Sequence, residues 1–213
     1  MPTAEKNIVA FLATVLAIAG VLVVSNCGAT RPIHYYTLNP EPPPLVAGAN
    51  KSDVPLPASI VVGHITASHL YLNDPIVYNT GAMQMGTYQY HRWAEFPVEM
   101  LETMLTQSLL SSGRYRSVAK LGSGVKGDYI LRGHLYSLEE VDSPSLAARF
   151  SMEIELFQPK TGLVVWSDTY THDEPVQHKT IASVVQGLRQ NVSVGLNQLT
   201  ENMNSYLSSV SPR

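Results

Sequence analysis

The stretch LAARFSMEIELF, residues 146–157, indicates the fold class most plainly. Apolar and polar side chains alternate along it, and this period of two is typical of a β-strand with one buried and one solvated face. The apolar positions are Leu146, Ala148, Phe150, Met152, Ile154 and Leu156. A tight turn at 159–162 follows, so residues 163–171, which carry Trp166, are predicted to return as the hairpin partner.

Outward from this hairpin, the sequence predicts a mainly antiparallel sheet. A glycine-rich turn at 122–127 leads into a strand over 128–141, and a further β-rich run covers 59–66. A hairpin around Asn79–Ala82, with strands near 76–78 and 83–88, and a short strand over 115–118 complete the set.

Two segments have helical periodicity. Residues 97–112 begin with Pro97 and are followed by Gly113, which suits a helix start and stop. Residues 179–207 carry an apolar stripe at helical spacing. Beside the stripe lies a row of small or short residues, Ser183, Gly187, Asn191 and Gly195. This row indicates either close packing of the helix on the sheet or a groove for a partner helix. We therefore expect an α+β fold, a single domain over 59–213 with two amphipathic helices packed on the sheet.

The N-terminal region has the composition of an export signal followed by a tether. Residues 8–24 are apolar except Thr14, after a short start that carries Lys6, and we interpret residues 1–26 as a lipoprotein signal peptide. Residues 27–58 are rich in proline, which favours extended chain, and are predicted to form a lipidated tether. Within them, residues 35–38 look like a small strand that docks on the domain.

Cys27 is the only cysteine of the chain and follows the apolar run directly after Val24-Ser25-Asn26. This arrangement resembles the bacterial lipobox, with Asn26 in place of the usual small residue. A lone exported cysteine cannot form an internal disulfide, and acylation removes the free thiol. We expect acyl chains on Cys27 to anchor the protein to the outer membrane on its periplasmic face. An uncleaved transmembrane anchor is the alternative, because the run lies at the short end of the roughly 17–25 residues that span a bilayer.

Composition and motifs argue against several functions. The chain has 14 Lys and Arg against 17 Asp and Glu without a basic cluster, so nucleic acid is not an expected partner. The GxGxxG letters at 122–127 precede a strand instead of a helix, which favours a turn over a nucleotide site. The seven histidines are scattered, and the pairs Glu139-Glu140 and Asp173-Glu174 look like solvated faces. We predict no catalytic residue, no metal and no cofactor apart from the acyl chains.

Residues 69–96 are unusually rich in aromatic side chains and methionine. Tyrosine and tryptophan are favoured at binding surfaces because they bury much area with few rotatable bonds. The candidate partner-binding residues are Tyr71, Leu72, Tyr88, Tyr90 and Trp93. The alternative interpretation is that these rings complete the hydrophobic core.

Four short motifs, in their order and spacing, resemble the ABC-type transport auxiliary lipoprotein family. They are Tyr35–Leu38, Tyr71–Val77, Arg92–Glu95 before the first helix, and Asp128–Leu131. Asn73 and Asp74 differ from the family's usual Asp-Arg pair, and Tyr78 stands where the family often has arginine.

The resemblance implies a non-enzymatic subunit that binds an MCE-domain protein and its transport complex. Such systems move lipids or other hydrophobic molecules between membranes. The resemblance leaves open whether the chain forms a homo-oligomer. The competing interpretation is a lipoprotein that regulates or helps to assemble another envelope machine, such as a peptidoglycan synthase. An enzyme is the third class.

Overall fold

A computed structural model describes residues 31–39, 56–81 and 83–210 of the 213-residue chain. The signal segment 1–26, Cys27 and most of the proline-rich tether lie outside the described residues. One folded unit begins at Ile33. Its elements are β1 (His34–Tyr36), β2 (Leu56–Ala67), η1 (His69–Leu72), β3 (Pro75–Asn79), β4 (Met85–Trp93), α2 (Pro97–Ser112), β5 (Tyr115–Lys120), β6 (Tyr129–Val141), β7 (Ala147–Gln158), β8 (Leu163–Pro175) and α3 (Ile181–Val210).

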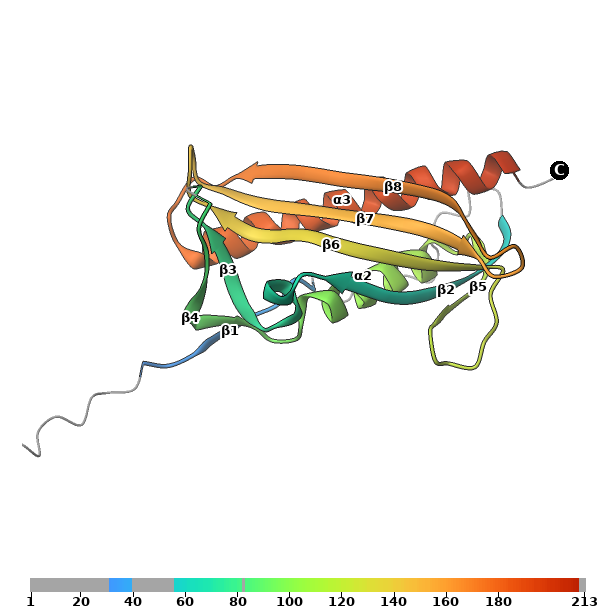
Figure 1. Cartoon of the computed structure of the whole chain (residues 1–213), viewed down its shortest axis with the longest axis horizontal. Helices are drawn as coiled ribbons and strands as arrows, with labels where there is room; N and C mark the ends of the chain where they lie inside the picture. The colour runs from blue at the N-terminus through green and yellow to red at the C-terminus, as the bar shows by residue number, and fades with distance from the viewer. Residues whose placement is uncertain (1–30, 40–55, 82, 211–213) are drawn as a thin grey trace, which may run out of the picture. The chain divides into compact units, whose positions relative to one another are not determined.

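Strands β6, β7 and β8 form a long antiparallel meander (Figure 1). Leu138 pairs with Phe150, and Leu131 pairs with Leu156, so the apolar positions of neighbouring strands share one face. All four of these side chains are buried. The alternation in residues 146–157 thus predicted the strand, its buried face and its hairpin partner correctly.

The other edge of β6 is shared by two strands that follow each other along it. Strand β2 pairs with the first half of β6, and β3 pairs with its last residues, both in parallel. Strand β5 lies beside β2 in parallel, and β4 lies beside β3 antiparallel. The sheet is therefore mixed, with its longest ladders antiparallel. The α+β class with a mainly antiparallel sheet is confirmed, and the parallel pairs were not foreseen.

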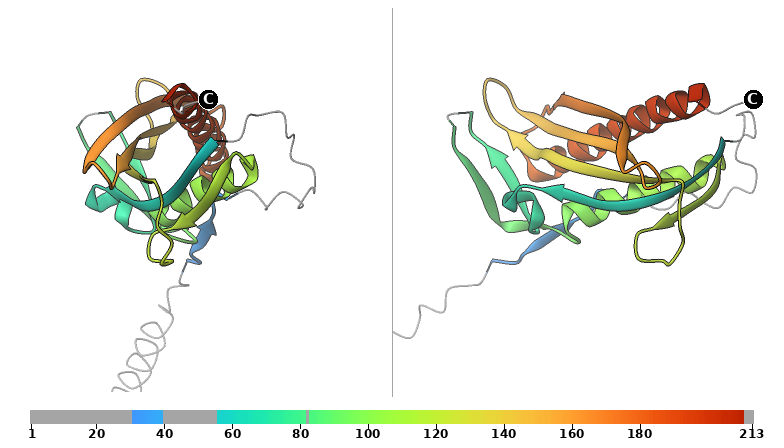
Figure 2. Two further views of the ribbon diagram at one scale, coloured as in Figure 1. Left: turned by 90° about the vertical axis from the view of Figure 1, so that its right-hand side faces the viewer. Right: turned by 45° about the vertical axis from the view of Figure 1, so that its right-hand side comes forward.

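The sheet curves around the two helices, as the end-on view of Figure 2 shows. Helix α2 packs on β2 and β5, and α3 packs on β7 and β8. Helix α2 has the bounds that the sequence predicts, because Pro97 starts it and Gly113 adopts a left-handed φ of 62° at its end. The amide of Gly113 donates to the carbonyl of Leu110, which satisfies one of the carbonyls left free at a helix end.

The small-residue row of α3 faces the sheet. A Cβ added at Gly195 would lie 2.6 Å from the Tyr170 ring and 2.9 Å from the Phe150 ring. A Cβ added at Gly187 would lie 3.0 Å from that of Ala148. The row therefore brings helix and sheet into close contact, and the alternative of a partner groove along this row is wrong.

The folded unit starts earlier than the expected boundary at residue 59. Strand β1 pairs in parallel with the edge of β4, so the docking of the small strand is confirmed. Leu38 is fully buried, and its amide donates to the Sδ atom of Met100 at 3.4 Å. Local sequence patterns do not show this earlier start, because β1 gains its partner only from a strand more than fifty residues away in sequence.

Candidate functional site

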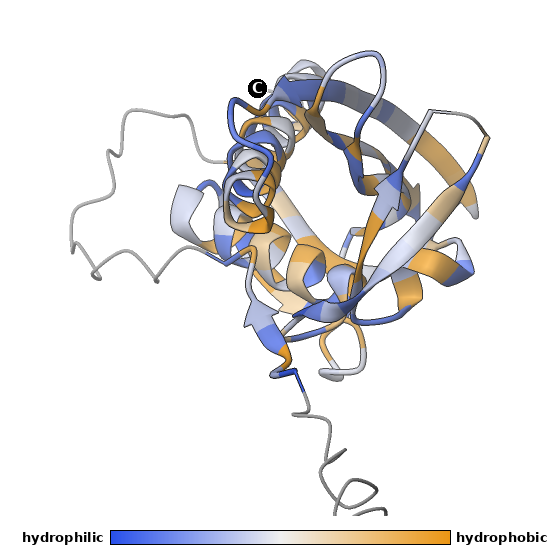
Figure 3. Cartoon of the chain, turned by 90° about the vertical axis from the view of Figure 1, so that its left-hand side faces the viewer, coloured by the Kyte–Doolittle hydropathy of each residue, from blue (hydrophilic) through white to orange (hydrophobic). Residues whose placement is uncertain are grey.

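Five aromatic side chains from β1, β3 and β4 form a row in space, and each ring contacts at least one other ring of the row. The ring centroids of His34 and His91 lie 5.4 Å apart in a stacked arrangement, and Tyr36 and Tyr88 each lie 5.8 Å from His91. Tyr78 continues the row at 5.1 Å from Tyr88. We call this set the aromatic ladder. The strands that carry it lie at one end of the domain, the left-hand end in Figure 1 and the end that faces the viewer in Figure 3.

Local irregularity in β4 places these rings on one side. The pairing of β3 with β4 shifts between Pro75 and Val77, so β4 contains a bulge. Such a bulge re-aims side chains, and here the rings of Tyr88 and His91 contact each other although the two residues are three positions apart, a spacing that puts side chains on opposite faces of a regular strand. Gly86 leaves room for the Tyr78 ring in this position, because a Cβ there would lie 2.5 Å from the Cζ atom of that ring.

Two buried glutamates anchor the aromatic segment to β6. Glu140 is 3% exposed and accepts a hydrogen bond from the Tyr88 hydroxyl at 2.8 Å. Glu139 is 2% exposed and accepts from the Tyr71 hydroxyl at 2.6 Å and from the Asn79 side chain at 3.3 Å. Buried carboxylates are costly unless hydrogen-bonded or paired, so these contacts hold η1, β3 and β4 in place.

The expectation that Glu139 and Glu140 form a solvated face is wrong. Consecutive strand residues point to opposite faces of the sheet, and here both faces are covered. The signal that could have shown this is their position at the end of an apolar strand next to Val141. Burial raises the pKa of Tyr71 and of Tyr88 well above the usual value, and the hydrogen bonds to the glutamates raise it further. Both phenols therefore stay protonated and act as donors.

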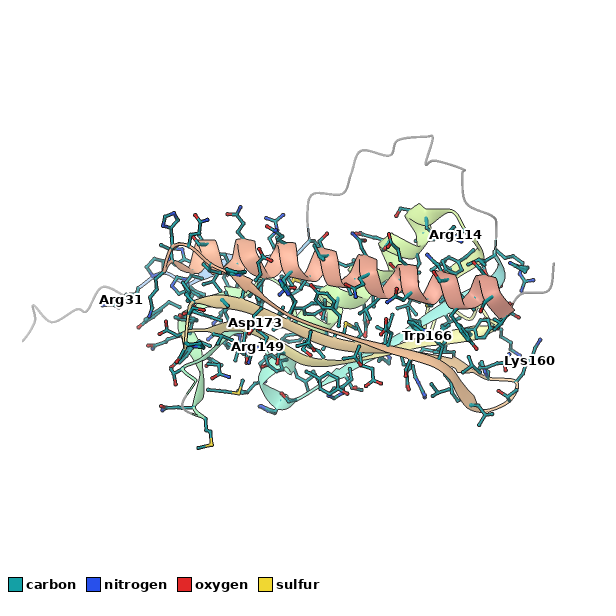
Figure 4. All side chains as sticks on the ribbon, turned by 90° about the horizontal axis from the view of Figure 1, so that it is seen from above. Arg31, Arg114, Arg149, Lys160, Trp166 and Asp173 are labelled. Atoms are coloured by element: carbon teal, nitrogen blue, oxygen red, sulfur yellow. The ribbon has the colours of Figure 1, made fainter. Side chains whose placement is uncertain are left out.

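A charged pair lies close to this anchor. Arg149 on β7 donates through Nε and Nη2 to the two carboxylate oxygens of Asp173 on β8, each at 2.7 Å, and Figure 4 shows the two side chains next to each other. The same guanidinium lies 3.7 Å from Glu139. The hydrogen bond from Arg149 lowers the pKa of Asp173. The expected solvated position of Asp173 holds in part, since its side chain is 44% exposed.

The structure divides the five expected partner-binding residues into two groups. Tyr71 and Trp93 are 3% and 1% exposed, so these two rings belong to the hydrophobic core, as the alternative interpretation predicts. Leu72 is 43% exposed at the end of η1. Tyr88 and Tyr90 are half-buried on β4, and Tyr88 belongs to the ladder. Sequence reasoning missed His34, Tyr36 and His91, because only the pairing of β1 with β4 brings them together.

The tip of the β3–β4 hairpin is exposed and apolar. Met83 is fully exposed with a φ of 56°, and Met85 is 41% exposed. Asn79 supports the turn by accepting from the amide of Gly81 at 2.9 Å. Methionine adapts its shape to different surfaces, so the tip extends the apolar character of this end of the domain.

The other motifs do not assemble a chemical site. Residues 122–127 form the turn that the sequence predicts, and β6 follows it, so the nucleotide interpretation fails. Within the described ranges, no three His, Cys, Asp or Glu side chains are grouped so that they could hold a metal ion. Neither of the helices α2 and α3, nor any other helix in the described part of the chain, is long and apolar enough to cross a membrane.

Comparison with known proteins defines the class of this protein. A family model described as the ABC-type transport auxiliary lipoprotein component matches residues 36–203. The chain therefore belongs to the ABC-type transport auxiliary lipoprotein family, as its motifs predict. No curated protein matches the chain.

Solved structures share the fold at low sequence identity. A crystal structure of a Xanthomonas campestris protein is 20% identical, with a TM-score of 0.66 over 81% of this chain and 99% of that one. A second crystal structure, of an uncharacterized protein, is 16% identical, with a TM-score of 0.60 over 80% of this chain and 99% of that one. At these identities the likeness concerns the fold alone.

Proposed function

We propose that this chain is the lipid-anchored, non-enzymatic subunit of an ABC-type transport system and that it acts by binding an MCE-domain protein of that system. The family match over residues 36–203 carries the proposal. The system would move lipids or other hydrophobic molecules between the two membranes of a bacterial envelope. In this role the chain sits on the periplasmic face of the outer membrane.

The leader and Cys27 support the anchoring. An apolar run that ends three residues before the only cysteine suits export followed by acylation. One acyl chain binds a membrane only marginally, whereas additional chains give durable attachment. Acyl chains on Cys27 would thus hold the domain at a membrane.

The aromatic ladder supports binding of a protein partner. Its rings are held by backbone pairing and, at Tyr88, by a buried carboxylate, so little side-chain freedom is lost when a partner covers them. Pre-organised aromatic side chains commonly dominate binding energy at protein interfaces. We assign the contact with the MCE-domain protein to the ladder and to the neighbouring hairpin tip, Met83 and Met85.

Affinity purification of the tagged full-length chain from crosslinked membranes of its own host tests this proposal. Quantitative mass spectrometry should recover an MCE-domain protein together with the permease of the transport system. Recovery should fall when His91→Ala and Tyr78→Ala are combined and should persist with Tyr136→Ala, which alters an exposed tyrosine outside the ladder. Enrichment of a peptidoglycan synthase in place of the transport proteins would overturn the proposal in favour of the competing interpretation.

A further inference from the structure

Two exposed side chains at the first strand are apolar or aromatic. Ile33 directly precedes β1 and is 45% exposed, and Tyr35 lies within β1 and is 62% exposed. Successive strand residues point to opposite faces, and His34 and Tyr36 both contact the ring of His91 in the aromatic ladder. Ile33 and Tyr35 therefore share the other face of β1, away from the ladder.

Leu72 extends this exposed face. Tyr35 is the strand partner of Arg92 on β4, and Nη1 of Arg92 donates to Oδ1 of Asp74 at 2.9 Å. Leu72, which is 43% exposed at the end of η1, precedes Asp74 by two residues. We call Ile33, Tyr35 and Leu72 the β1 patch. Exposed apolar side chains that gather in one place mark contact sites for proteins or membranes.

The length of chain before β1 favours a membrane as the occupant of the β1 patch. Five residues, 28–32, separate Cys27 from Ile33, so the backbone of Ile33 can lie no more than about 20 Å from that of the acylated cysteine. A tether this short gives the patch an effective concentration of about millimolar relative to the lipid. The bilayer is therefore always within reach of the patch, whereas contact with a protein requires an encounter.

The residue types around the β1 patch suit the interface of a bilayer. Tyrosine is enriched at this interface because its ring is apolar and its hydroxyl group is polar. Residues 28–38 include no Asp or Glu, and Arg31 brings a positive charge two residues before Ile33. Anionic lipid headgroups attract an arginine near the surface. The nearby carboxylate of Asp74 is paired with Arg92, so charge does not oppose the contact.

We propose that the β1 patch rests in the interfacial layer of the bilayer that holds the acyl chains of Cys27. The contact fixes the orientation of the folded unit on the membrane. The patch faces the lipid, and the aromatic ladder, on the other face of β1, stays open to a protein partner. The inference rests on the proposed function in one respect, which is the acylation of Cys27.

Depth-dependent fluorescence quenching tests the contact in the full-length acylated chain, reconstituted into vesicles of phosphatidylethanolamine and phosphatidylglycerol. Acylation blocks the thiol of Cys27, the only cysteine, so Ile33→Cys or Leu72→Cys introduces a unique free thiol for an environment-sensitive fluorophore. We expect blue-shifted emission and strong quenching by nitroxide-labelled lipids, with the fluorophore within about 5–10 Å of the headgroup boundary.

Two labelled controls distinguish membrane contact from tethering alone. Leu163→Cys replaces an apolar side chain that is 62% exposed at the start of β8, at the far end of the domain from β1 (Figure 1). Gln186→Cys replaces an exposed side chain that lines the same surface hollow as Tyr36, on the ladder side of β1. Both labels should emit as they do in water, with quenching several-fold weaker than at Ile33.

Changes at Tyr35 test whether the patch itself carries the contact. Tyr35→Asp should reduce the quenching of the Leu72 label several-fold, because a carboxylate is costly to transfer into an apolar layer. Tyr35→Trp should keep the quenching, since tryptophan favours the same layer as tyrosine. The side chain is exposed in the folded unit, so both variants should keep the melting temperature of the wild type.

Three results would overturn the inference. They are labels at Ile33 and Leu72 that are quenched no more than at Leu163, equal quenching at Gln186, and quenching that is unchanged by Tyr35→Asp. Acylated protein that gives one of these results and still recovers the MCE-domain protein retains the proposed function. Strong quenching that meets all the controls without recovery of that protein does the reverse. An intact mass without acyl chains would overturn the anchoring and this inference together.

Discussion

At the scale of single residues, buried polar groups with complete hydrogen bonding hold the sheet and helices together. Asn191 is 1% exposed on α3, and its Nδ2 donates to the carbonyls of Ala148 at 2.9 Å and His172 at 2.8 Å. Its Oδ1 accepts from the Tyr170 hydroxyl at 2.8 Å. One side chain thus joins α3 to both β7 and β8, in a place where an unpaired carbonyl would be costly.

Replacing Asn191 by Ala should lower the free energy of unfolding by about 1–3 kcal/mol or more, because the change leaves buried carbonyl and hydroxyl groups without partners. Chemical denaturation measures the effect. Asn197→Ala is the matched control, since this asparagine lies exposed on the same helix, and it should change stability by less than about 0.5 kcal/mol. Equal effects of the two variants would show that the bonds of Asn191 do not stabilise the fold.

The buried tyrosines predict a loss of stability at alkaline pH. Burial raises the pKa of Tyr115 to about 12, and burial with the bond to Glu139 raises that of Tyr71 further. In the unfolded chain these groups lose their protons near pH 10. The unfolded state therefore binds fewer protons above about pH 10, and stability falls as the pH rises toward the folded-state pKa values.

Melting temperatures measured between about pH 8 and pH 11 should show this fall. Tyr71→Phe and Tyr115→Phe should each make the decline shallower, whatever their effect near neutral pH. A decline that keeps the wild-type slope in both variants would contradict the assignment to these phenols.

At the scale of elements, α3 on β7 and β8 is the largest layer contact of the domain. Its buried stripe includes Leu188, Val192 and Leu199, none of them measurably exposed. Truncation of a fully buried leucine to Ala lowers the free energy of unfolding by about 2–5 kcal/mol. In Figure 4 the helix extends over the strands from the neighbourhood of Arg149 to that of Trp166. This contact depends on glycines that let the helix approach the sheet.

Gly195→Ala tests that dependence. Alanine is worth up to about 1 kcal/mol more than glycine inside a helix, so an unconstrained site would be stabilised. Here the added methyl group would meet Tyr170 and Phe150, and we expect a net loss of about 1–3 kcal/mol from overpacking. Ser205→Ala, an exposed control on the same helix, should be neutral or slightly stabilising in the same denaturation assay.

Local patterns predicted the elements well, and long-range pairing accounts for what they missed. The period of two in residues 146–157 and the proline and glycine around α2 act over a few residues, so the sequence alone shows them. The parallel docking of β2 on β6, the aromatic ladder and the burial of Glu139 depend on contacts across more than fifty residues. The sequence shows that residues 69–96 are rich in aromatic side chains. It does not show which of these side chains are buried, because other elements of the fold cover Tyr71 and Trp93.

At the scale of the whole molecule, the proposed function requires a membrane anchor joined to a binding domain. The family match defines a transport auxiliary lipoprotein, and the proposed contact surface lies at the end of the domain where β1 enters the sheet. The chain that leads from Cys27 to β1 is short, since His34 already belongs to the strand. Fully extended, the intervening residues would reach only about 20–25 Å.

Anchoring predicts a clear effect of Cys27→Ala. This change should abolish labelling of the protein by a fatty-acid analogue in cells and block the processing that removes the signal peptide, because the acylated thiol is lost. Cys27→Ser serves as a second variant of nearly unchanged size. Labelling and membrane attachment that persist in both variants would contradict the lipoprotein assignment.

The proposed role of the aromatic ladder is tested by the affinity of the full-length chain for the MCE-domain protein of its own system, compared between Tyr78→Ala and Tyr136→Ala. We expect Tyr78→Ala to weaken binding by about 1–2 kcal/mol or more, the range of interface hot spots. Tyr136→Ala should leave affinity unchanged, with melting temperatures recorded for both variants. Equal affinities for wild type and Tyr78→Ala, or no binding by the wild type, would contradict this role.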